Sequence, residues 1–357
     1  MKDDLIEGRQ VLRTDDLERR EMMAVQLDEA RSYLSRGTVV HARLAFILLD
    51  NAAEVIMRRN IEAALSNNMF WENILDRWQE ILAEHPGNAE ASRQRDEVKS
   101  KVVSKRTRKA LAAGFDAKVD FICKQGGLQE TEARVLKKLH QYRNELYHRD
   151  HIRPETIRSV CLLYFDLACT LFETLAQAQF SVVTVHMQAP EALRKFAVPG
   201  SENGYPAVEQ IAASLRAGLS IDDASLRKFL AEHLTARLDD LDSAISQAVD
   251  ALFGEVSALV PTGPWRRAVV HHAQWKTDEL PESLDELLDS KVTYEEADLA
   301  CWRQRVAELQ EINGRMEQFA AFADIEDAFE PFEEQVVAFG QRIDLEIQRE
   351  ADIWRGK

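Results

Sequence analysis

Apolar residues recur at helical spacing along most of this chain, and this periodicity is the feature that most constrains its fold. Within residues 129–150, Val135, Leu139, Tyr142 and Leu146 follow one another at offsets of four, three and four, which places them on one helix face. The same periodicity extends over residues 38–65, 69–84, 225–253 and 294–353, whereas the alternation typical of strands is missing. Glycine and proline number only 14 and 9 in 357 residues, which favours long helices with few turns. We predict an all-α protein.

Two expected helices near the N-terminus supply apolar faces for a core. The helix over 38–65 is expected to bury Val40, Leu44, Ile47, Leu48, Ala52, Val55 and Ile56 and to turn Arg43, Asp50, Glu54 and Arg58 to other faces. The helix over 69–84 ends before a proline-glycine pair, and its Trp71 and Trp78, one heptad apart, are expected in the core. The polar stretch 88–108 is either a solvated helix or a mobile basic arm. Residues 181–187 are either a strand or a frayed helix end.

Breaker residues divide the chain. The segment from Val198 to Pro206 concentrates proline, glycine and polar residues and is the best linker in the sequence. We therefore predict a helical domain over 1–195, a linker over 196–206 and a second helical domain of unknown role over 207–357. Residues 1–200 carry 30 Lys and Arg against 29 Asp and Glu, whereas 201–357 carry 15 against 32. The net charge of −16 therefore belongs to the second domain, within which Pro331 is expected to be the main helix interruption.

The compartment is predicted from the termini and the cysteines. The N-terminal residues Met1-Lys2-Asp3-Asp4-Leu5 are acidic where a secretory signal is basic and then apolar, and no apolar run is expected to approach membrane-spanning length. Four cysteines form neither metal-ligand pairs nor a disulfide framework, so we expect them in the core: Cys123, Cys161, Cys169 and Cys301. These features predict a cytoplasmic protein without a membrane partner.

The segment Arg143-Asn144-Glu145-Leu146-Tyr147-His148 is the strongest candidate for chemistry. An arginine followed five residues later by a histidine also occurs in the pairs Arg36/His41, Arg266/His271 and Arg267/His272, so the spacing alone carries little information. Three features set Arg143 and His148 apart: an asparagine directly after the arginine, an apolar pair directly before the histidine, and a position near the end of a periodic helix. Pro154 begins the next expected helix, so a short bend follows the motif.

These residue types match the needs of RNA cleavage. Because RNA carries its own nucleophile, the 2′-hydroxyl, cleavage needs a group that moves protons and a cation that stabilises the phosphorane-like transition state. His148 and Arg143 fit these roles without a metal or another cofactor, and Asn144 could hold the imidazole or a phosphate oxygen. The helix C-terminus favours protonated His148, which suits a general acid or a phosphate-binding cation, and the choice stays open. One copy is an incomplete clamp, so the motif predicts a homodimer whose two-fold axis brings two arginines and two histidines together.

The motif, preceded by the amphipathic Leu48-Leu49-Asp50-Asn51-Ala52-Ala53-Glu54-Val55-Ile56 helix, resembles the HEPN superfamily. Members are small helical bundles, and many are metal-independent endoribonucleases of toxin, CRISPR-associated and anti-phage systems whose paired Arg-polar-x3-His motifs form a composite dimer site. The resemblance covers roughly residues 30–187 and implies an HEPN-like bundle, catalytic roles for Arg143, Asn144 and His148, and a possible antitoxin or regulatory partner. In one branch of HEPN toxins a tyrosine follows the histidine by two residues. Asp150 stands there instead, so regulation through adenylylation of that tyrosine is not implied.

Two further segments are candidates for nucleic-acid contact. A basic cluster lies just upstream of the motif and is either a solvated face or an approach for the RNA backbone: Lys99, Lys101, Lys105, Arg106, Arg108 and Lys109. No aromatic residue interleaves it, so any RNA binding there should be weakly selective and salt-sensitive. The stretch from Pro264 to His272 combines cations, Trp265 and two adjacent histidines, for which a structural use is favoured over a metal site.

A second interpretation comes from a different functional class. Arg143 and His148 could be solvent-facing helix residues, with His148 capping the last carbonyls. The chain would then be a non-catalytic HEPN-like interaction or sensor module that binds a partner protein or a nucleic acid. The sequence offers no Gly-rich phosphate loop, no His-Glu-x-x-His zinc motif and no serine-nucleophile elbow, so it gives no support to ATP-dependent, zinc-hydrolase or acyl-transfer chemistry.

Overall fold

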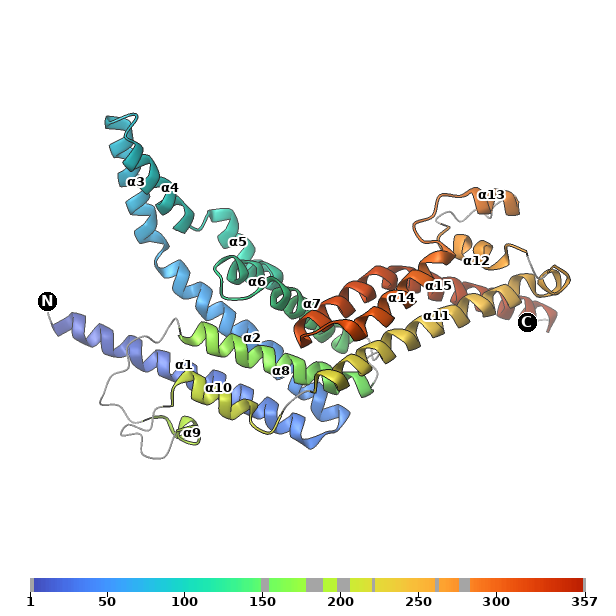
Figure 1. Ribbon diagram of the computed structural model, residues 1–357, viewed down its shortest axis with the longest axis horizontal. Helices are drawn as coiled ribbons and strands as arrows, with labels where there is room; N and C mark the ends of the chain where they lie inside the picture. Colours follow the sequence, from blue (N-terminus) through green and yellow to red (C-terminus); the bar gives the residue numbers. More distant parts are fainter. Residues whose placement is uncertain are drawn as a thin grey trace. The chain divides into compact units, whose positions relative to one another are not determined.

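The computed structural model describes residues 3–148, 154–177, 189–197, 206–219, 222–260, 263–275 and 283–355, and only the backbone of residues 3–17, 146–148, 154–156 and 177. Every regular element in these ranges is a helix, which confirms the all-α prediction (Figure 1). The chain divides into two compact units, residues 1–221 and 222–357. Residues 149–153, the bend expected after the motif, and residues 181–187 lie outside the described ranges.

Three long helices build the core of the first unit. Helix α2 (Val39–Ser66) packs along α8 (Pro154–Gln177), and α1 (Asp3–Arg36) packs against both. Thr38 caps α2 by accepting a hydrogen bond from the His41 backbone nitrogen at 3.3 Å. Side chains from all three helices are fully buried between them, among them Leu27, Phe46, Leu49, Tyr164, Phe165 and Phe172. Burial of so many large apolar groups is the main term that stabilises this unit.

The buried stripe of α2 differs in phase from the predicted one. Val40 is 67% exposed and Leu44 is 41% exposed, whereas Asp50, expected on another face, is only 2% exposed. The apolar side chains that α2 buries over this stretch are Ala42, Ala45, Phe46, Leu49, Ala52, Ala53, Ile56 and Met57. The predicted face was therefore wrong except at Ala52 and Ile56. The small alanines define the buried side because they let neighbouring helices approach closely, and counting only the large apolar residues overlooked them.

Helix α3 (Asn68–Glu84) and α4 (Ala89–Lys101) form a hairpin that extends from the end of α2 (Figure 1). The core positions predicted for Trp71 and Trp78 are wrong, since both rings are only half-buried. The reason is that the neighbouring helix α4 is mostly polar and buries only Ala91 and Val98, so it does not cover the apolar face of the amphipathic α3. For the stretch 88–108 the sequence allowed either a solvated helix or a mobile basic arm. The structure shows a helix, which runs through α4 and begins again in α5 (Lys105–Ala113).

Helix α10 (Val208–Arg216) extends the first unit beyond the predicted linker. Its last residue, Arg216, donates to Glu173 at 2.8 Å and to Asp166 at 3.1 Å, both on α8. Leu215 and Ile211 are fully buried. The unit therefore runs to Ile221 rather than ending at residue 195. Most of the predicted linker, residues 198–205, lies outside the described ranges, and the short helix α9 (Glu191–Arg194) precedes it.

The second unit is built on two long helices, α11 (Asp223–Leu259) and α15 (Arg315–Trp354). Phe319, Phe322, Phe329 and Phe332 of α15 are fully buried. Arg237 of α11 forms ion pairs with Glu326 and Glu333 of α15 and lies over the Phe329 ring at 4.8 Å. The shorter elements are α12 (Trp265–Ala273), α13 (Leu284–Asp289), α14 (Glu296–Glu308) and the 3-10 turn η1 (Leu309–Glu311).

The predicted interruption at Pro331 is wrong, because α15 continues through this proline. The long periodic stretch 294–353 breaks instead at residues 312–314, where Gly314 adopts a φ of 88°. Glycine takes this left-handed conformation without the steric cost that a side chain imposes.

Two further expectations need correction. Helix α8 contains a run of 20 residues, Ile157–Ala176, that is apolar and long enough to cross a membrane, although most of it is buried in the core of the first unit. A core helix of a globular protein has the same composition, so this run is weak grounds for a membrane assignment. Of the four cysteines, Cys161 and Cys169 are buried as expected, Cys123 is half-buried and Cys301 is exposed.

Candidate functional site

Helix α7 (Glu130–His148) carries the arginine-histidine motif at its C-terminal end. The backbone nitrogen of Gln129, just before the helix, donates to Glu132 Oε2 at 2.9 Å. Val135 and Leu139 are fully buried and Tyr142 nearly so, which confirms this part of the predicted stripe. The side chains of Leu146 and His148 lie outside the described residues. The structure therefore places the backbone of His148 at the end of α7 and describes nothing of its imidazole.

Arg143 and Asn144 are brought together directly. Arg143 Nη1 donates to Asn144 Oδ1 at 3.1 Å. Arg143 Nε lies 3.5 Å from Asp50 Oδ2 of α2, and the arginine side chain is 36% exposed. The Nε edge of the guanidinium therefore forms an ion pair with a buried anion, while part of the arginine side chain faces solvent.

Asp50 is the functional candidate that the sequence reasoning missed. Its carboxylate is nearly inaccessible, and its Oδ1 accepts the Tyr164 hydroxyl at 2.8 Å. The same oxygen lies 2.9 Å from His140 Nδ1. A buried charge is costly unless it is paired and hydrogen-bonded, and Asp50 meets both conditions with residues from α7 and α8. The signal in the sequence that could have identified Asp50 was its position among the alanines of α2, because these alanines mark the buried side of that helix.

His140 is held from two sides. Besides the contact with Asp50, its ring stacks on Phe115 with centroids 3.7 Å apart and planes 3° from parallel. Phe115 begins helix α6 (Phe115–Lys124), which packs against both α2 and α7. The histidine side chain remains 19% exposed. Its ring orientation is therefore fixed while part of the side chain stays within reach of solvent.

The electrostatics of this network keep Tyr164 neutral. Burial raises the pKa of the Tyr164 hydroxyl well above its ordinary value, and the nearby Asp50 carboxylate raises it further. The neutral hydroxyl donates a hydrogen bond to the carboxylate, and an ionised carboxylate has only acceptor atoms to offer. The Tyr164 contact thus compensates Asp50 from the core side, whereas Arg143 and His140 compensate it from α7.

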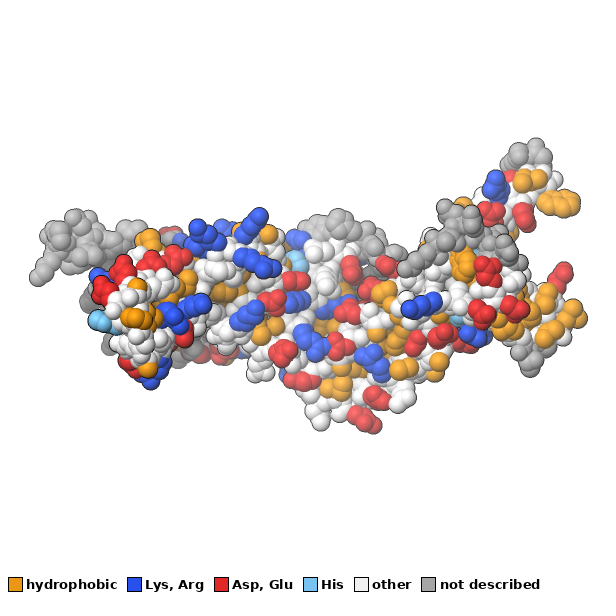
Figure 2. All heavy atoms as spheres, turned by 90° about the horizontal axis from the view of Figure 1, so that it is seen from above, with side chains coloured by type: hydrophobic (Ala, Val, Ile, Leu, Met, Phe, Trp, Pro, Cys, Tyr) orange, Lys and Arg blue, Asp and Glu red, His pale blue; other side chains and the backbone are white. Residues whose placement is uncertain are grey.

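The predicted RNA-binding cluster divides between two helices. Lys99 and Lys101 lie in the last turn of α4, and Lys105, Arg106, Arg108 and Lys109 lie on α5. Two of these cations have partners, since Lys101 pairs with Glu97 at 2.8 Å and Arg108 pairs with Glu72 at 3.1 Å. The remaining four side chains are exposed. Figure 2 shows basic side chains gathered over this part of the first unit.

The other arginine-histidine pairs have local structural partners. Arg36 Nη1 lies 3.4 Å from His41 Nε2 on the surface. Arg266 pairs with Asp242 and with Glu296, the latter at 2.8 Å. Arg267 donates to the Leu288 carbonyl at 3.2 Å. Among the described residues, the guanidinium of the Arg143 motif differs from these three in being set against a buried carboxylate shared with a histidine.

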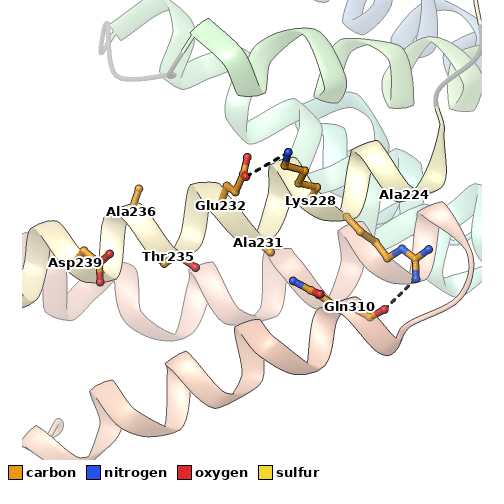
Figure 3. A pocket seen from close by; sticks show the side chains of 9 residues that line it. Ala224, Lys228, Ala231, Glu232, Thr235, Ala236, Asp239 and Gln310 are labelled. Atoms are coloured by element: carbon orange, nitrogen blue, oxygen red, sulfur yellow. Dashed lines mark hydrogen bonds and ion pairs between the residues drawn. The ribbon is translucent and has the colours of Figure 1, made fainter.

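A hollow on the second unit lies along α11. Its lining residues include the small Ala224, Ala231 and Thr235 and the charged Lys228, Glu232 and Asp239 (Figure 3). Lys228 lies 3.9 Å from Glu232, and Arg227 donates to the Gln310 carbonyl at 2.9 Å. These polar groups pair with one another along the helix and do not converge on a common point, so the hollow is a weaker candidate than the Asp50 network.

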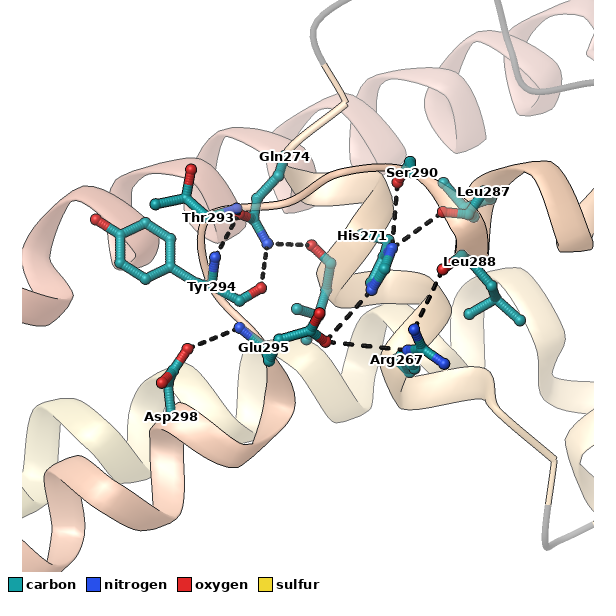
Figure 4. A network of polar contacts seen from close by, with 11 residues as sticks. Arg267, His271, Gln274, Leu287, Leu288, Ser290, Thr293, Tyr294, Glu295 and Asp298 are labelled. Carbon is teal, nitrogen blue, oxygen red and sulfur yellow. Dashed lines mark hydrogen bonds and ion pairs between the residues drawn. The ribbon is translucent and has the colours of Figure 1, made fainter.

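The two adjacent histidines of α12 have structural surroundings, as favoured from the sequence. His271 is buried, with Nδ1 at 3.0 Å from the Leu287 carbonyl and 3.1 Å from Ser290 Oγ (Figure 4). Gln274 ties the loop before α14 to α12 by accepting from the backbone nitrogens of Thr293 and Tyr294, both at 2.9 Å. Nowhere in the described ranges do three His, Cys, Asp or Glu side chains gather as ligands for a metal ion.

Comparison of the chain with protein-family models, with curated proteins and with solved structures finds no match.

Proposed function

We propose that this protein is a metal-independent endoribonuclease of the HEPN type that cleaves RNA through attack of the 2′-hydroxyl on the adjacent phosphate. The observation that carries the proposal is the setting of Arg143. Its Nε lies 3.5 Å from the buried Asp50 carboxylate, its Nη1 donates to Asn144, and the side chain as a whole is 36% exposed. An arginine fixed in this way loses little freedom when it binds a phosphate, which favours transition-state stabilisation.

The proposed chemistry assigns one role to each residue of the motif. Arg143 stabilises the charge that develops on the non-bridging phosphate oxygens, and Asn144 orients the guanidinium. His148 ends α7, where the helix dipole favours its protonated form, so it donates a proton to the departing 5′-oxygen. The products are a 2′,3′-cyclic phosphate, or the phosphate formed by its hydrolysis, and a 5′-hydroxyl.

The proposed site is complete only with a second copy of the chain. One α7 contributes one arginine and one motif histidine, whereas a two-fold axis beside the helix end joins two of each around a single phosphate. We therefore propose a homodimer. A cytoplasmic role as a toxin or anti-phage effector, held in check by an antitoxin or regulatory protein, belongs to the same proposal and follows from the HEPN resemblance.

The basic cluster gives this site a route for substrate. Lys99, Lys105, Arg106 and Lys109 are exposed on α4 and α5, and α5 leads directly into Phe115 beside His140. We propose that this surface attracts the RNA backbone, with the binding losing strength as salt rises.

Incubation of the purified protein with structured RNA in excess EDTA tests the proposal. We expect the wild-type protein to cleave, and Arg143→Ala and His148→Ala each to lower kcat/KM by at least about 100-fold, the usual scale for removal of one such group. Arg36→Ala and His41→Ala are matched controls, because they remove the same residue types at the same spacing from the surface of the same unit. Equal cleavage by all five proteins would remove the motif from the mechanism.

The second candidate is a non-catalytic interaction module, which the α3–α4 hairpin favours. Met69 is 72% exposed and Phe70 is 58% exposed on α3, an unusual amount of apolar surface for one short helix. This candidate predicts no RNA products from any variant and no growth inhibition when the gene is expressed. Cells that tolerate the His148→Ala gene but not the wild-type gene would decide for the enzyme.

A further inference from the structure

The Asp50–His140 pair supplies what the proposed site still needs, a group that removes the proton of the 2′-hydroxyl. The composite site of the proposed dimer holds two His148 residues, one of which acts as the acid, and no residue has yet been assigned as the base. His140 lies three residues before Arg143 on α7, about one helical turn away, and both contact the same carboxylate. The arginine and this histidine are therefore fixed relative to each other by one buried group.

The tautomer of His140 follows from its partner. The Asp50 carboxylate accepts the Tyr164 hydroxyl and faces Arg143, and a carboxylate in this setting has only lone pairs to offer. His140 Nδ1 must therefore carry the hydrogen in the 2.9 Å contact with Asp50. In the neutral ring this leaves the lone pair on Nε2, at the far edge from Asp50. An aspartate that holds the Nδ1–H of a histidine so that Nε2 can act as a base is a recurring catalytic arrangement.

The ring is also held in orientation. The nearly parallel stack on Phe115, at 3.7 Å between centroids, blocks rotation of the imidazole about its side-chain bonds. Because the side chain is still 19% exposed, this restraint does not seal it from solvent.

We infer that His140 is a catalytic residue, the general base of the proposed ribonuclease, and that Asp50 is its positioning residue. The inference rests on the proposed function. His140 Nε2 takes the proton of the 2′-hydroxyl, the 2′-oxygen forms a bond to phosphorus, and the bond from phosphorus to the 5′-oxygen breaks. His148 gives a proton to the 5′-oxygen, so that one proton is taken up and one released. Arg143 stabilises the non-bridging oxygens throughout.

A substrate with sulfur in place of the bridging 5′-oxygen separates base from acid. A 5′-thiolate leaves without being protonated, so loss of the general acid costs little with this RNA, whereas loss of the general base costs as much as before. We expect His148→Ala to regain most of its activity on the sulfur substrate. We expect His140→Gln to stay about 100-fold or more below wild type in kcat on both substrates, with KM within a few-fold.

Several variants keep this test independent of folding. His140→Gln retains an amide that can donate to Asp50, and His140→Phe retains the stack on Phe115. If one of these variants lacks a cooperative thermal transition and is therefore not folded, the other takes its place in the assay. His140→Ala leaves room for free imidazole, which should restore part of kcat. Asp50→Asn should lower kcat with little change in KM, and that split separates positioning from simple loss of stability. His85→Gln, in the exposed turn between α3 and α4, is the matched control.

The outcomes separate this inference from the proposed function. Wild-type rates for His140→Gln, together with inactive Arg143→Ala and His148→Ala, would overturn the role of His140 and leave the ribonuclease intact. Recovery of His140→Gln on the sulfur substrate would also overturn it, because that result assigns His140 to the acid side. Wild-type rates for Arg143→Ala would overturn the proposed function itself.

Discussion

Asp50 organises the polar interior of the first unit at the scale of single residues. It joins α2 to Tyr164 of α8 and to His140 and Arg143 of α7. Side-chain polarity alone placed it at the surface, because the apolar count along α2 favoured a different face. What could be predicted was the motif helix, whereas the contact of Asn144 with Arg143 was not expected, since Asn144 was assigned to the imidazole or a phosphate oxygen. The shared carboxylate could not be predicted, since it depends on which faces of three helices meet.

Removal of the Tyr164 hydroxyl should test how much this network stabilises the unit. Tyr164→Phe deletes a 2.8 Å hydrogen bond to a buried carboxylate, and we expect the free energy of unfolding to fall by about 1.5–3 kcal/mol, the range for bonds to charged groups. Urea denaturation measures this change. Tyr33→Phe, on a ring that stacks against surface His41, serves as the control and should have a smaller effect. Equal effects at the two positions would contradict the assigned importance of Asp50.

His272 predicts how acid affects the second unit. Burial, with a smaller contribution from Arg342, lowers the pKa of this imidazole below its ordinary 6.5. The folded state therefore binds fewer protons than the unfolded state just below pH 6.5, so stability is lost as the pH falls through that range. His272→Gln should flatten the pH dependence of the melting temperature between about pH 7.5 and 5.5. If the melting temperature of His272→Gln depends on pH as steeply as that of the wild type, the loss of stability in acid belongs to other groups.

At the scale of elements, helix α5 is the part of the chain most directly tied to RNA affinity. The charges of Lys105, Arg106 and Lys109 lie on one short helix and are exposed. Each phosphate that the protein no longer neutralises should change the slope of log affinity against log salt by about 0.7 for single-stranded RNA, so the triple serine variant should change it by about 2. Arg93→Ser with Arg95→Ser on α4 is the control, since both arginines already pair with acidic neighbours. Equal slopes for the two variants would remove α5 from the binding surface.

Element types could be predicted well from spacing, whereas faces and breaks could not. The helix starts at Val39, Asn68 and Pro154 lie at or next to the predicted positions. The half-buried Trp71 and Trp78 and the intact helix at Pro331 departed from prediction. Burial depends on the partner helix, and the buried phenylalanines on either side of Pro331 offset the backbone hydrogen bond that a proline removes. Local periodicity reports the amphipathic pattern of a helix and not the surface that covers it.

At the scale of the whole molecule, the two compact units predict separable folding. The second unit has its own core of α15 phenylalanines and its own partly buried ion pairs around Arg237. We expect a fragment of residues 222–357 to be helical and to melt cooperatively without the first unit, as followed by circular dichroism. A fragment that lacks a cooperative transition would show that this unit depends on the other for its fold.

The proposed site also predicts the mass of the protein in solution. Sedimentation should give twice the chain mass of 40.7 kDa, because one copy supplies one Arg143 and one His148. A mixture of Arg143→Ala and His148→Ala proteins, unfolded and refolded together, should recover part of the activity that each lacks alone. A strictly monomeric species with full activity would contradict the composite site.

The 3′ ends of RNA fragments produced in excess EDTA test the central claim most directly. Attack by the 2′-hydroxyl predicts fragments that end in a 2′,3′-cyclic phosphate or its hydrolysis product, and the loss of these ends in Arg143→Ala and His148→Ala. Fragments that end in a 3′-hydroxyl, or cyclic ends that persist unchanged in both variants, would contradict the account.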